Sequence, residues 1–498
     1  MLASLDEAAN AAKGKMQKQA LHPIAKMDRR HVWHPFTQMR DWFKREPIVI
    51  AEGEGAVLRD IRGRSYLDAN SSIWTNLHGH NHPALNRAIT RQLGKIAHSS
   101  SLGFANVPAS RLATALVEAA KTEAPRSSKG AAQPKLTKVF FSDDGSTAME
   151  VALKLSFEHA RRAGVVRKPR FLSLEGAYHG DTVGAVSLGH IGLFHRAYGG
   201  LLFRTESAMS PYCYRCPFNR AKPERADARE YRRCDWECVS SVEKQFNVAR
   251  KSGRPFSAFA VEPLMQGAAG MIPQPEGWLR RVAAIARDEG AHLIADEVMT
   301  GFGRTGIGGA RGAALFACQK EGVVPDFLAL AKGLTGGYLP MAATLTTAEV
   351  FDAFLGEYSE FKTFFHGHSF TGNQLGAAAG LESLALLQRR SSLPQRGRLE
   401  TAFAQELESL WDLPQVGDVR RVGLVAGVEL VKDWRSRRAF DLRQRVGIRV
   451  CERMAELGVL TRPIGNVVVL MPPYCTTREQ ISTMVRALRT AIRDLAPS

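Results

Sequence analysis

Lys332 is a lysine in surroundings that suit a reactive amine. It follows the apolar run 327–331 and precedes the glycine-rich turn 333–337. Removing an amine from water disfavours its charged form and lowers its pKa, so a larger share of the free amine can attack a carbonyl group and form an imine. Lys332 is therefore a candidate Schiff-base residue. On this stretch alone, the alternative is a lysine that extends to solvent from a loop beside a core strand.

Two further places in the chain could serve the same chemistry. Gly145 and Ser146 stand where a polar turn passes into an expected helix. The unpaired amides and the positive dipole end of such a helix start favour an anion, although a simple hydroxyl cap is the alternative. Asp296 ends an apolar segment that is expected to form a strand, and Tyr178 follows another. In a parallel sheet, ligands bind beyond the carboxyl ends of the strands.

An imine-forming lysine, an anion-binding helix start and a strand-end carboxylate together meet the needs of pyridoxal phosphate. They would supply the Schiff base, the phosphate site and the partner of the pyridinium nitrogen. Asp296 would keep that nitrogen protonated, and Lys332 would move a proton as general base and acid. The alternative for Asp296 is an ordinary carboxylate at a strand end.

These residues need a sheet to position them, and the sequence predicts one. Strand and helix patterns alternate from about residue 138 to 345, which favours an α/β fold with a mainly parallel sheet covered by helices on both sides. Short alternating strands are expected near 48–69, and an α+β region after about 420. We expect an N-terminal segment, 1–75, that contributes to a small domain, a large cofactor-binding domain, 76–345, and a C-terminal small domain, 346–498.

Composition narrows the class of protein. The chain has 498 residues, of which 45% are hydrophobic, and so can build sizeable globular cores. No apolar run approaches the length of a membrane span, and the N-terminal stretch lacks a hydrophobic signal core, so we expect a cytoplasmic protein. The net charge is +18. Because the basic residues are spread along the chain without interleaved aromatics, we expect small-molecule substrates and no nucleic acid.

Four of the seven cysteines lie in a polar insertion at about 207–245, which interrupts the α/β pattern. Cys213 and Cys216 form a CxxC, and Cys234 and Cys238 form a CxxxC. Four such thiols could hold a structural zinc ion. The alternative is a set of reduced thiols in a surface excursion, and we predict no metal among the residues of the functional site.

Two motifs resemble the signature of the class III aminotransferases. They are IADEVMTGFGRTG at 294–306 and LALAKGLTGGYLP at 328–340, and the similarity runs from about residue 30 to the C-terminus. The resemblance implies a fold-type I pyridoxal-phosphate-dependent transferase, with a mainly parallel seven-stranded sheet in the large domain and a small α+β domain. It also implies a homodimer with shared active sites.

Four other stretches are similar to one subfamily, the diaminopelargonate synthases. These aminate 8-amino-7-oxononanoate to 7,8-diaminononanoate in biotin biosynthesis. The stretches are HVWHPFTQM at 31–39, SSIWTNLHGHNHP at 71–83, FFHGHSFTGNQLG at 364–376 and TRPIGNVVVLMPPY at 461–474. A class III transaminase of ω-amino acids, which would share every cofactor motif, is the alternative.

The resemblance also implies roles for single residues. Gly145 and Ser146 would bind the cofactor phosphate, and Tyr178 would stack on the pyridine ring and face the substrate. His368 and Ser369 would reach the phosphate of the neighbouring subunit's cofactor. The remaining implied residues line the substrate pocket: Phe36, Trp74, Gly367 and Arg462.

Arg462 would hold the carboxylate of the oxononanoate with a two-pronged contact, and the alternative is a surface arginine. Two positions depart from the pattern of the enzymes that use adenosylmethionine. Phe36 stands in place of a tyrosine, and Ile73 precedes Trp74 in place of a tryptophan pair. Some of the same motifs also resemble the variant of the family that takes lysine as its amino donor. The amino donor, adenosylmethionine or lysine, therefore stays open.

Overall fold

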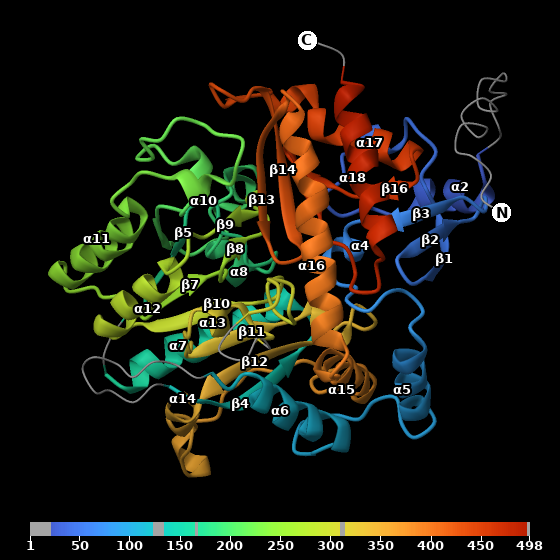
Figure 1. Ribbon diagram of the computed structural model, residues 1–498. Coiled ribbons are helices and arrows are strands. Elements are labelled where there is room, and N and C mark those ends of the chain that lie inside the picture. The colour runs from blue at the N-terminus through green and yellow to red at the C-terminus, as the bar shows by residue number, and fades with distance from the viewer. Residues whose placement is uncertain (1–20, 123–133, 165–167, 309–313, 496–498) are drawn as a thin grey trace. The chain divides into compact units, whose positions relative to one another are not determined.

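The computed structural model describes residues 21–122, 134–164, 168–308 and 314–495 (Figure 1). In this part of the chain, one compact unit comprises the residues up to Gly53 together with Leu58–Ser65, and the other comprises Glu54–Val57 together with the residues from Tyr66 onward. The prediction that the N-terminal stretch lacks a hydrophobic signal core concerns residues 1–20, which lie outside the described ranges. The large domain and the C-terminal small domain that the sequence predicts, 76–345 and 346–498, both lie in the second unit. The boundary between these two domains therefore stays a prediction.

The first unit is small and is organised around Asp28. This residue lies in α2 (Pro23–His31), and its carboxylate accepts from Trp42 Nε1 at 3.0 Å and lies 2.9 Å from His34 Nε2. Short strands are present near 48–69, as expected, and their residues are divided between the two units. The strands are β1 (Ile50–Glu54), β2 (Val57–Asp60) and β3 (Ser65–Asp68).

A seven-stranded sheet dominates the second unit. Its strand order is β4-β12-β11-β10-β7-β5-β6. Strand β10 pairs in parallel with β11 and β7, and β5 pairs in parallel with β7 and β6, whereas β12 runs antiparallel to both β11 and β4. The mainly parallel sheet is therefore confirmed. The strands are β4 (Leu136–Ser142), β5 (Phe171–Leu174), β6 (Glu206–Ala208), β7 (Ala258–Val261), β10 (His292–Asp296), β11 (Phe327–Leu330) and β12 (Ala342–Thr347).

Both faces of this sheet are covered by helices, as the alternating pattern predicted. Side chains of neighbouring residues in a strand point to opposite faces. Leu293 belongs to one core together with Trp278 of α12 (Trp278–Asp288), whereas Ile294 belongs to another together with Ala152 of α7 (Gly145–Arg162). Strands that are buried on both sides read as continuous apolar runs, which is how these segments appear in the sequence.

Helices and smaller sheets surround the central sheet. The remaining helices of the second unit are α4 (Ser71–Trp74), α5 (Pro83–Leu93), α6 (Val107–Ala119), α8 (Val183–Ser187), α9 (Gly192–His195), α10 (Ala228–Tyr231), α11 (Glu237–Lys251), α13 (Ala317–Lys320), α14 (Ala348–Asp352), α15 (Gln374–Gln388), α16 (Ser392–Glu408), α17 (Val446–Glu456) and α18 (Arg478–Arg493). The remaining strands are β8 (Met265–Gln266), β9 (Ile272–Pro273), β13 (Val416–Val422), β14 (Val425–Asp433), β15 (Arg438–Ala439), β16 (Val459–Leu460), β17 (Pro463–Ile464) and β18 (Val467–Leu470). Among the described helices, none combines the length and the apolar character that a membrane crossing requires.

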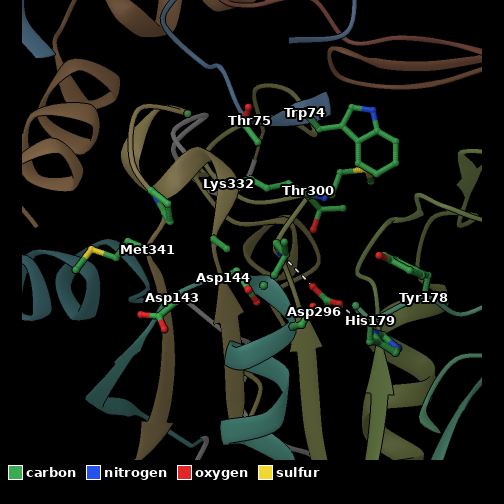
Figure 2. Close-up of a pocket in the computed structure, with 18 of the residues that line it drawn as sticks. Trp74, Thr75, Asp143, Asp144, Tyr178, His179, Asp296, Thr300, Lys332 and Met341 are labelled. Carbon is green, nitrogen blue, oxygen red and sulfur yellow. Dashed lines mark hydrogen bonds and ion pairs between the residues drawn. The ribbon is translucent and has the colours of Figure 1, made fainter. Parts of the chain in front are cut away.

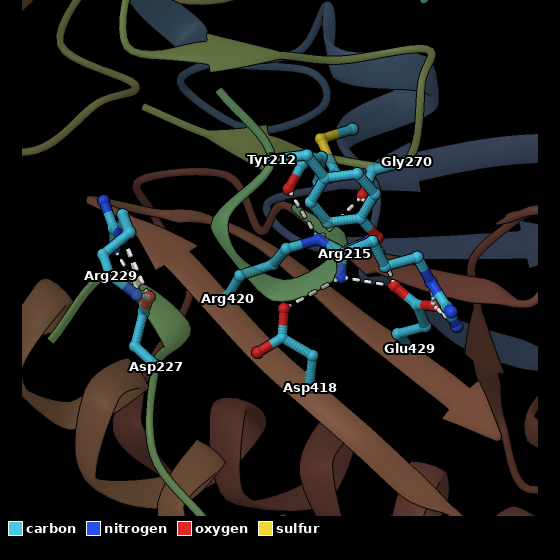
Figure 3. A network of polar contacts seen from close by, with 9 residues as sticks. Tyr212, Arg215, Asp227, Arg229, Gly270, Asp418, Arg420 and Glu429 are labelled. Atoms are coloured by element: carbon cyan, nitrogen blue, oxygen red, sulfur yellow. Dashed lines mark hydrogen bonds and ion pairs between the residues drawn. The ribbon is translucent and has the colours of Figure 1, made fainter. Parts of the chain in front are cut away.

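A buried arginine ties the C-terminal sheet to the β8–β9 hairpin (Figure 3). Arg420, in β13, donates to the Gly270 carbonyl at 2.6 Å and to the Met271 carbonyl at 2.8 Å. It also pairs with Asp418 at 3.0 Å and with Glu429 of β14 at 2.6 Å. Only 1% of the Arg420 side chain is exposed. The turn of this hairpin contains Ala268, which lines the cavity described next.

Candidate active site

A cavity of about 430 Å³ lies at the carboxyl ends of the parallel strands (Figure 2). Most of its lining residues lie at or after the ends of β4, β5, β7, β10 and β11. Because β12 runs antiparallel, its start lies at the same edge of the sheet and adds Pro340 and Met341 to the lining. This is the position at which open α/β sheets bind ligands, and the volume suits a small organic molecule.

Lys332 enters this cavity from the end of β11. Its side chain is partly accessible through the cavity and otherwise surrounded by protein. Burial lowers the pKa of its amine to about 8, although the negative charges of Asp296 and Glu262 oppose the shift. Its backbone is left-handed, with φ of 46°, a conformation that is costly for a residue with a Cβ and that is often found at functional sites. The Lys332 amine also lies 4.6 Å from the centre of the Trp74 ring.

Asp296 is the last residue of β10 and is held through both of its carboxylate oxygens. Oδ1 accepts from the Val298 backbone N–H at 3.1 Å, and Oδ2 lies 2.7 Å from His179 Nδ1. The residue is 6% exposed. Such a carboxylate has a fixed plane and an accessible edge on the cavity, as the partner of a positively charged ring nitrogen needs.

The start of α7 supplies an anion site. Asp144 caps the helix by accepting from the Thr147 N–H at 2.9 Å. The preceding N–H groups, of Gly145 and Ser146, have no acceptor within the helix and lie at its positive end. A Cβ on Gly145 would lie 2.7 Å from the Val298 side chain, so only glycine allows the helix start to approach β10 this closely.

Tyr178 and Glu262 complete one wall of the cavity. The Tyr178 hydroxyl donates to Asp181 at 2.8 Å, and its backbone N–H donates to Glu262 at 3.4 Å. The other Glu262 oxygen accepts from the Gly267 N–H at 2.7 Å. Burial raises the pKa of Glu262 to about 7, and the positive charge of His179 opposes this shift. Glu262 therefore braces both the aromatic wall and the turn before β9.

Trp74 reaches the cavity from a left-handed turn. All four residues of α4 have positive φ angles, between 47° and 69°. The buried Asp68 carboxylate holds this turn by accepting from the Ser72 N–H at 3.1 Å and from the Ser72 hydroxyl at 3.0 Å. His80 Nε2 lies 2.9 Å from the same carboxylate.

The cavity brings together six of the residues predicted from the sequence: Trp74, Gly145, Ser146, Tyr178, Asp296 and Lys332. The other five are not among its lining residues. Phe36 belongs to the first unit and is exposed. Arg462 is exposed on the C-terminal part of the chain, and Gly367 is exposed in the segment before α15. The roles proposed for these residues stay predictions.

His368 and Ser369 occupy the same exposed segment as Gly367. His368 Nδ1 lies 3.3 Å from Asp143 of its own chain, and Asp143 lines the cavity beside the start of α7. The Ser369 carbonyl lies 2.9 Å from His98 Nε2. Their expected contact with the cofactor of a partner subunit stays a prediction.

Several residues that line the cavity were not predicted from the sequence, chiefly His179, Glu262 and Val298. Glu262 ends an apolar strand just as Asp296 does, and this signal could have identified it. His179 directly follows Tyr178, but its contact with Asp296 joins positions 117 residues apart. No local pattern indicates that contact.

The four cysteines of the insertion line one small cavity, together with Arg232. Arg232 Nη1 lies 3.1 Å from Cys234 Sγ. However, no three or more His, Cys, Asp or Glu side chains in the described ranges are grouped so that they could hold a metal ion. All seven cysteines are free. The zinc site and its alternative, a set of reduced thiols, both stay predictions.

Comparisons with known proteins agree with this arrangement. Residues 39–492 match the family described as aminotransferase class-III. The adenosylmethionine-8-amino-7-oxononanoate aminotransferase of Geobacter sulfurreducens is 46% identical, over 94% of this chain and 97% of its own. A crystal structure of the protein of that name from Methanocaldococcus jannaschii has a TM-score of 0.83 and 38% identity, over 95% of this chain and 98% of its own. The omega transaminase from Pseudomonas jessenii in complex with PMP has the same TM-score but 26% identity, over 96% of this chain and 100% of its own.

Proposed function

The chain belongs to the class-III aminotransferases, and we propose that it transfers an amino group to 8-amino-7-oxononanoate with pyridoxal phosphate as its cofactor. The product would be 7,8-diaminononanoate. The identity of 46% to a relative named for this reaction carries the choice of substrate. The buried amine, the fixed carboxylate and the helix start around one cavity support the choice of cofactor.

The residues on the cavity fit pyridoxal phosphate. When bound, this cofactor supplies an aldehyde that condenses with amines and a ring that withdraws electrons from the carbon next to the amine nitrogen. Gly145 and Ser146 would hold its phosphate, Tyr178 would stack on its ring, and Asp296 would pair with its ring nitrogen. Val298, whose side chain lies close to Gly145, would cover the opposite face of the ring.

Lys332 would bind the cofactor between turnovers and move a proton during them. Because burial lowers the pKa of this amine to about 8, a substantial fraction is uncharged near neutral pH and can act as a nucleophile or as a base. The Trp74 ring beside the amine helps to exclude water from it. Asp296, held by two donors, would keep its negative charge directed at the ring nitrogen throughout.

The residues that would contact the substrate are proposals too. Trp74 lines the cavity and would contact the apolar chain of the ketone. Arg462 would pair with the carboxylate at the end of that chain, and Phe36 and Gly367 would complete the pocket. The donor is adenosylmethionine or lysine. The expected cytoplasmic location and the expected lack of a nucleic-acid partner also stay predictions.

A second copy of this chain would complete each site. Large apolar side chains are exposed along two segments that contact each other, since Ser101 Oγ donates to the Thr371 carbonyl at 2.9 Å. They include Leu102, Phe104, Phe365 and Phe370, which are 88%, 73%, 70% and 59% exposed. An exposed apolar surface of this kind is typical of an interface. In a homodimer it would be covered, and His368 and Ser369 would lie near the partner's phosphate site.

The decisive assay offers the purified, cofactor-loaded protein 8-amino-7-oxononanoate with adenosylmethionine or with lysine. Mass spectrometry should detect 7,8-diaminononanoate with at least one donor, and the Lys332→Ala protein should form none. Growth of a biotin auxotroph that lacks this step should be restored by the wild-type gene alone. A different outcome is the transfer of amino groups only from ω-amino acids to other ketones. In that case the assignment as an omega transaminase would replace this one, and it rests on the relative that is 26% identical.

A further inference from the structure

Asp68 is a buried carboxylate at the end of β3, just before the α4 turn. Its Oδ1 accepts from the Ser72 backbone N–H at 3.1 Å, and its Oδ2 accepts from the Ser72 hydroxyl at 3.0 Å. We propose that Asp68 is a positioning residue, which acts through this turn to fix the Trp74 ring as a wall of the cavity, where the chain of the ketone binds. This inference rests on the proposed function.

The α4 turn needs such support because its backbone is strained. Ser71, Ser72, Ile73 and Trp74 are all left-handed, a conformation that is costly for residues with a Cβ. A strained backbone persists only where the surrounding structure holds it. In a right-handed turn the bond from Cα to Cβ of Trp74 would point in another direction, so the left-handed form decides where the ring lies.

The position of the Trp74 ring matters because of what the ring contacts. Trp74 packs against a buried cluster that contains Met265 and Met299, and its ring centre lies 4.6 Å from the Lys332 amine (Figure 2). Met299 and Lys332 line the cavity together with Trp74. A displaced ring would therefore open the apolar wall of the cavity beside the Lys332 amine.

A chain of hydrogen bonds fixes the Asp68 carboxylate in turn. The Gly79 N–H donates to Asn76 Oδ1 at 2.8 Å, which sets the orientation of the amide, so Asn76 Nδ2 donates to His80 Nδ1 at 2.9 Å. His80 therefore carries a proton on Nε2, which donates to Asp68 Oδ2 at 2.9 Å. Burial raises the pKa of Asp68, but the hydrogen bonds from His80 and Ser72 outweigh burial, and the pKa is lowered. Asp68 is thus an ionised acceptor at neutral pH.

Two substitutions separate positioning from a purely structural role. Asp68→Asn keeps the shape of the side chain but, whichever way its amide is turned, places an N–H against groups that donate to the carboxylate. Ser72→Ala removes one of these donors from an exposed residue. Asp60→Asn is the matched control, because Asp60 is also buried and accepts from two backbone N–H groups, those of Arg62 and Arg64, at 2.9 Å each. Asp60 is not among the residues that line the cavity.

The first readout is the accessibility of the Trp74 ring in the full-length protein freed of cofactor. Acrylamide quenching of Trp74 fluorescence is obtained as the difference between each protein and its Trp74→Phe version. We expect Asp68→Asn to raise the quenching constant of Trp74 at least about twofold, because a turn released from its support exposes the ring. Ser72→Ala should change it in the same direction. Asp60→Asn should match the wild type in quenching, although both aspartate variants lower the melting temperature.

The second readout is the KM for 8-amino-7-oxononanoate in the cofactor-loaded enzyme. Asp68→Asn should raise this KM at least about tenfold, with a smaller change in kcat, because the Trp74 ring contributes chiefly to substrate binding. In the Trp74→Ala protein, Asp68→Asn should raise KM no further, since both substitutions act through the same ring.

An Asp68→Asn protein that loses stability but keeps the wild-type quenching of Trp74 would overturn the inference. A KM effect that persists in full without the Trp74 ring would also overturn it. If Asp68→Asn does not fold, Ser72→Ala replaces it, and wild-type quenching in that protein would overturn the inference. The quenching measurement needs neither cofactor nor ketone. Quenching as expected, in a protein whose wild type does not aminate 8-amino-7-oxononanoate, would refute the substrate assignment but not the positioning of Trp74.

Discussion

The Lys332 amine and its two carboxylate neighbours set the reactivity of the cavity. Burial lowers the pKa of the amine, but Asp296 and Glu262 limit the fall to a value of about 8. An amine with an ordinary pKa near 10.4 would be almost wholly protonated at neutral pH. The site therefore combines a usable fraction of nucleophile with enough charge on the neighbouring carboxylates to bind a cationic ring.

This balance predicts how cofactor capture depends on pH. Only the uncharged amine of Lys332 can attack the aldehyde, so the rate at which apoprotein captures pyridoxal phosphate should rise with pH and reach half its maximum near pH 8. Stopped-flow absorbance at a series of pH values measures this rate. Borohydride reduction should attach the cofactor to the wild type but not to the Lys332→Ala protein. A midpoint above pH 10 would show that burial does not govern this amine.

Single residues differ in how well the sequence predicted them. Lys332, Asp296 and Gly145 each stand where an expected strand ends or an expected helix begins, and all three line the cavity. His179 depends on a contact between distant segments, and the left-handed backbone of Lys332 leaves no trace in composition. Arg462 is the opposite case. The family resemblance implies a role for it, but its side chain is exposed in the single chain, and the role stays a prediction.

Among the elements, the parallel sheet was predictable but the direction of β12 was not. A strand buried on both faces is a continuous apolar run in either direction, so Ala342–Thr347 could not be distinguished from its parallel neighbours. Its antiparallel pairing places Met341 at the cavity edge of the sheet. The conformation of α4 was equally hidden, since nothing in SSIW marks a left-handed turn.

The α4 turn stores strain that glycine should relieve. A left-handed residue with a Cβ costs about 1–2 kcal/mol, and Ile73, with φ of 61°, is 45% exposed. Glycine adopts this conformation freely, although it also increases the entropy of the unfolded chain by about 0.4–1 kcal/mol. The Ile73→Gly protein should therefore unfold at an equal or higher urea concentration than the wild type.

Ile448 offers a matched control for this substitution. It is 38% exposed within the right-handed helix α17, where replacement by glycine should cost about 1 kcal/mol. The two variants should thus move the urea midpoint differently, with only Ile448→Gly lowering it clearly. An equal loss in both would show that α4 is not strained as its φ angles indicate.

The Arg420 network should contribute more to stability than any exposed ion pair. Replacing Arg420 by methionine would leave the buried Asp418 carboxylate without its charged partner and would leave Glu429 with Arg215 and Tyr212 only, at a cost of about 3–5 kcal/mol. Arg453, which pairs with Asp494 at the surface, is the control, and its methionine variant should lose less than about 1 kcal/mol. Urea denaturation measures both. Similar losses in the two proteins would contradict the weight given to burial.

At the scale of the whole molecule, the proposed homodimer makes each site depend on two chains. Lys332 and Asp296 lie in one cavity of one chain, whereas His368 and Ser369 would serve the cavity of the partner. Point-group symmetry then gives each dimer two equivalent composite sites. A defect in Lys332 and a defect in the 368–369 segment of the same chain would therefore fall in different sites.

Mixed dimers test this arrangement. A Lys332→Ala subunit should be inactive alone, as should a subunit with both His368→Ala and Ser369→Ala, but coexpression with two affinity tags should yield mixed dimers with one intact site. At random assembly, the mixture should recover about one quarter of wild-type activity. Lys332→Ala mixed with Asp296→Asn is the control and should recover none, because both of its sites stay defective. No recovery in either mixture would mean that His368 and Ser369 act within their own chain, where His368 already contacts Asp143.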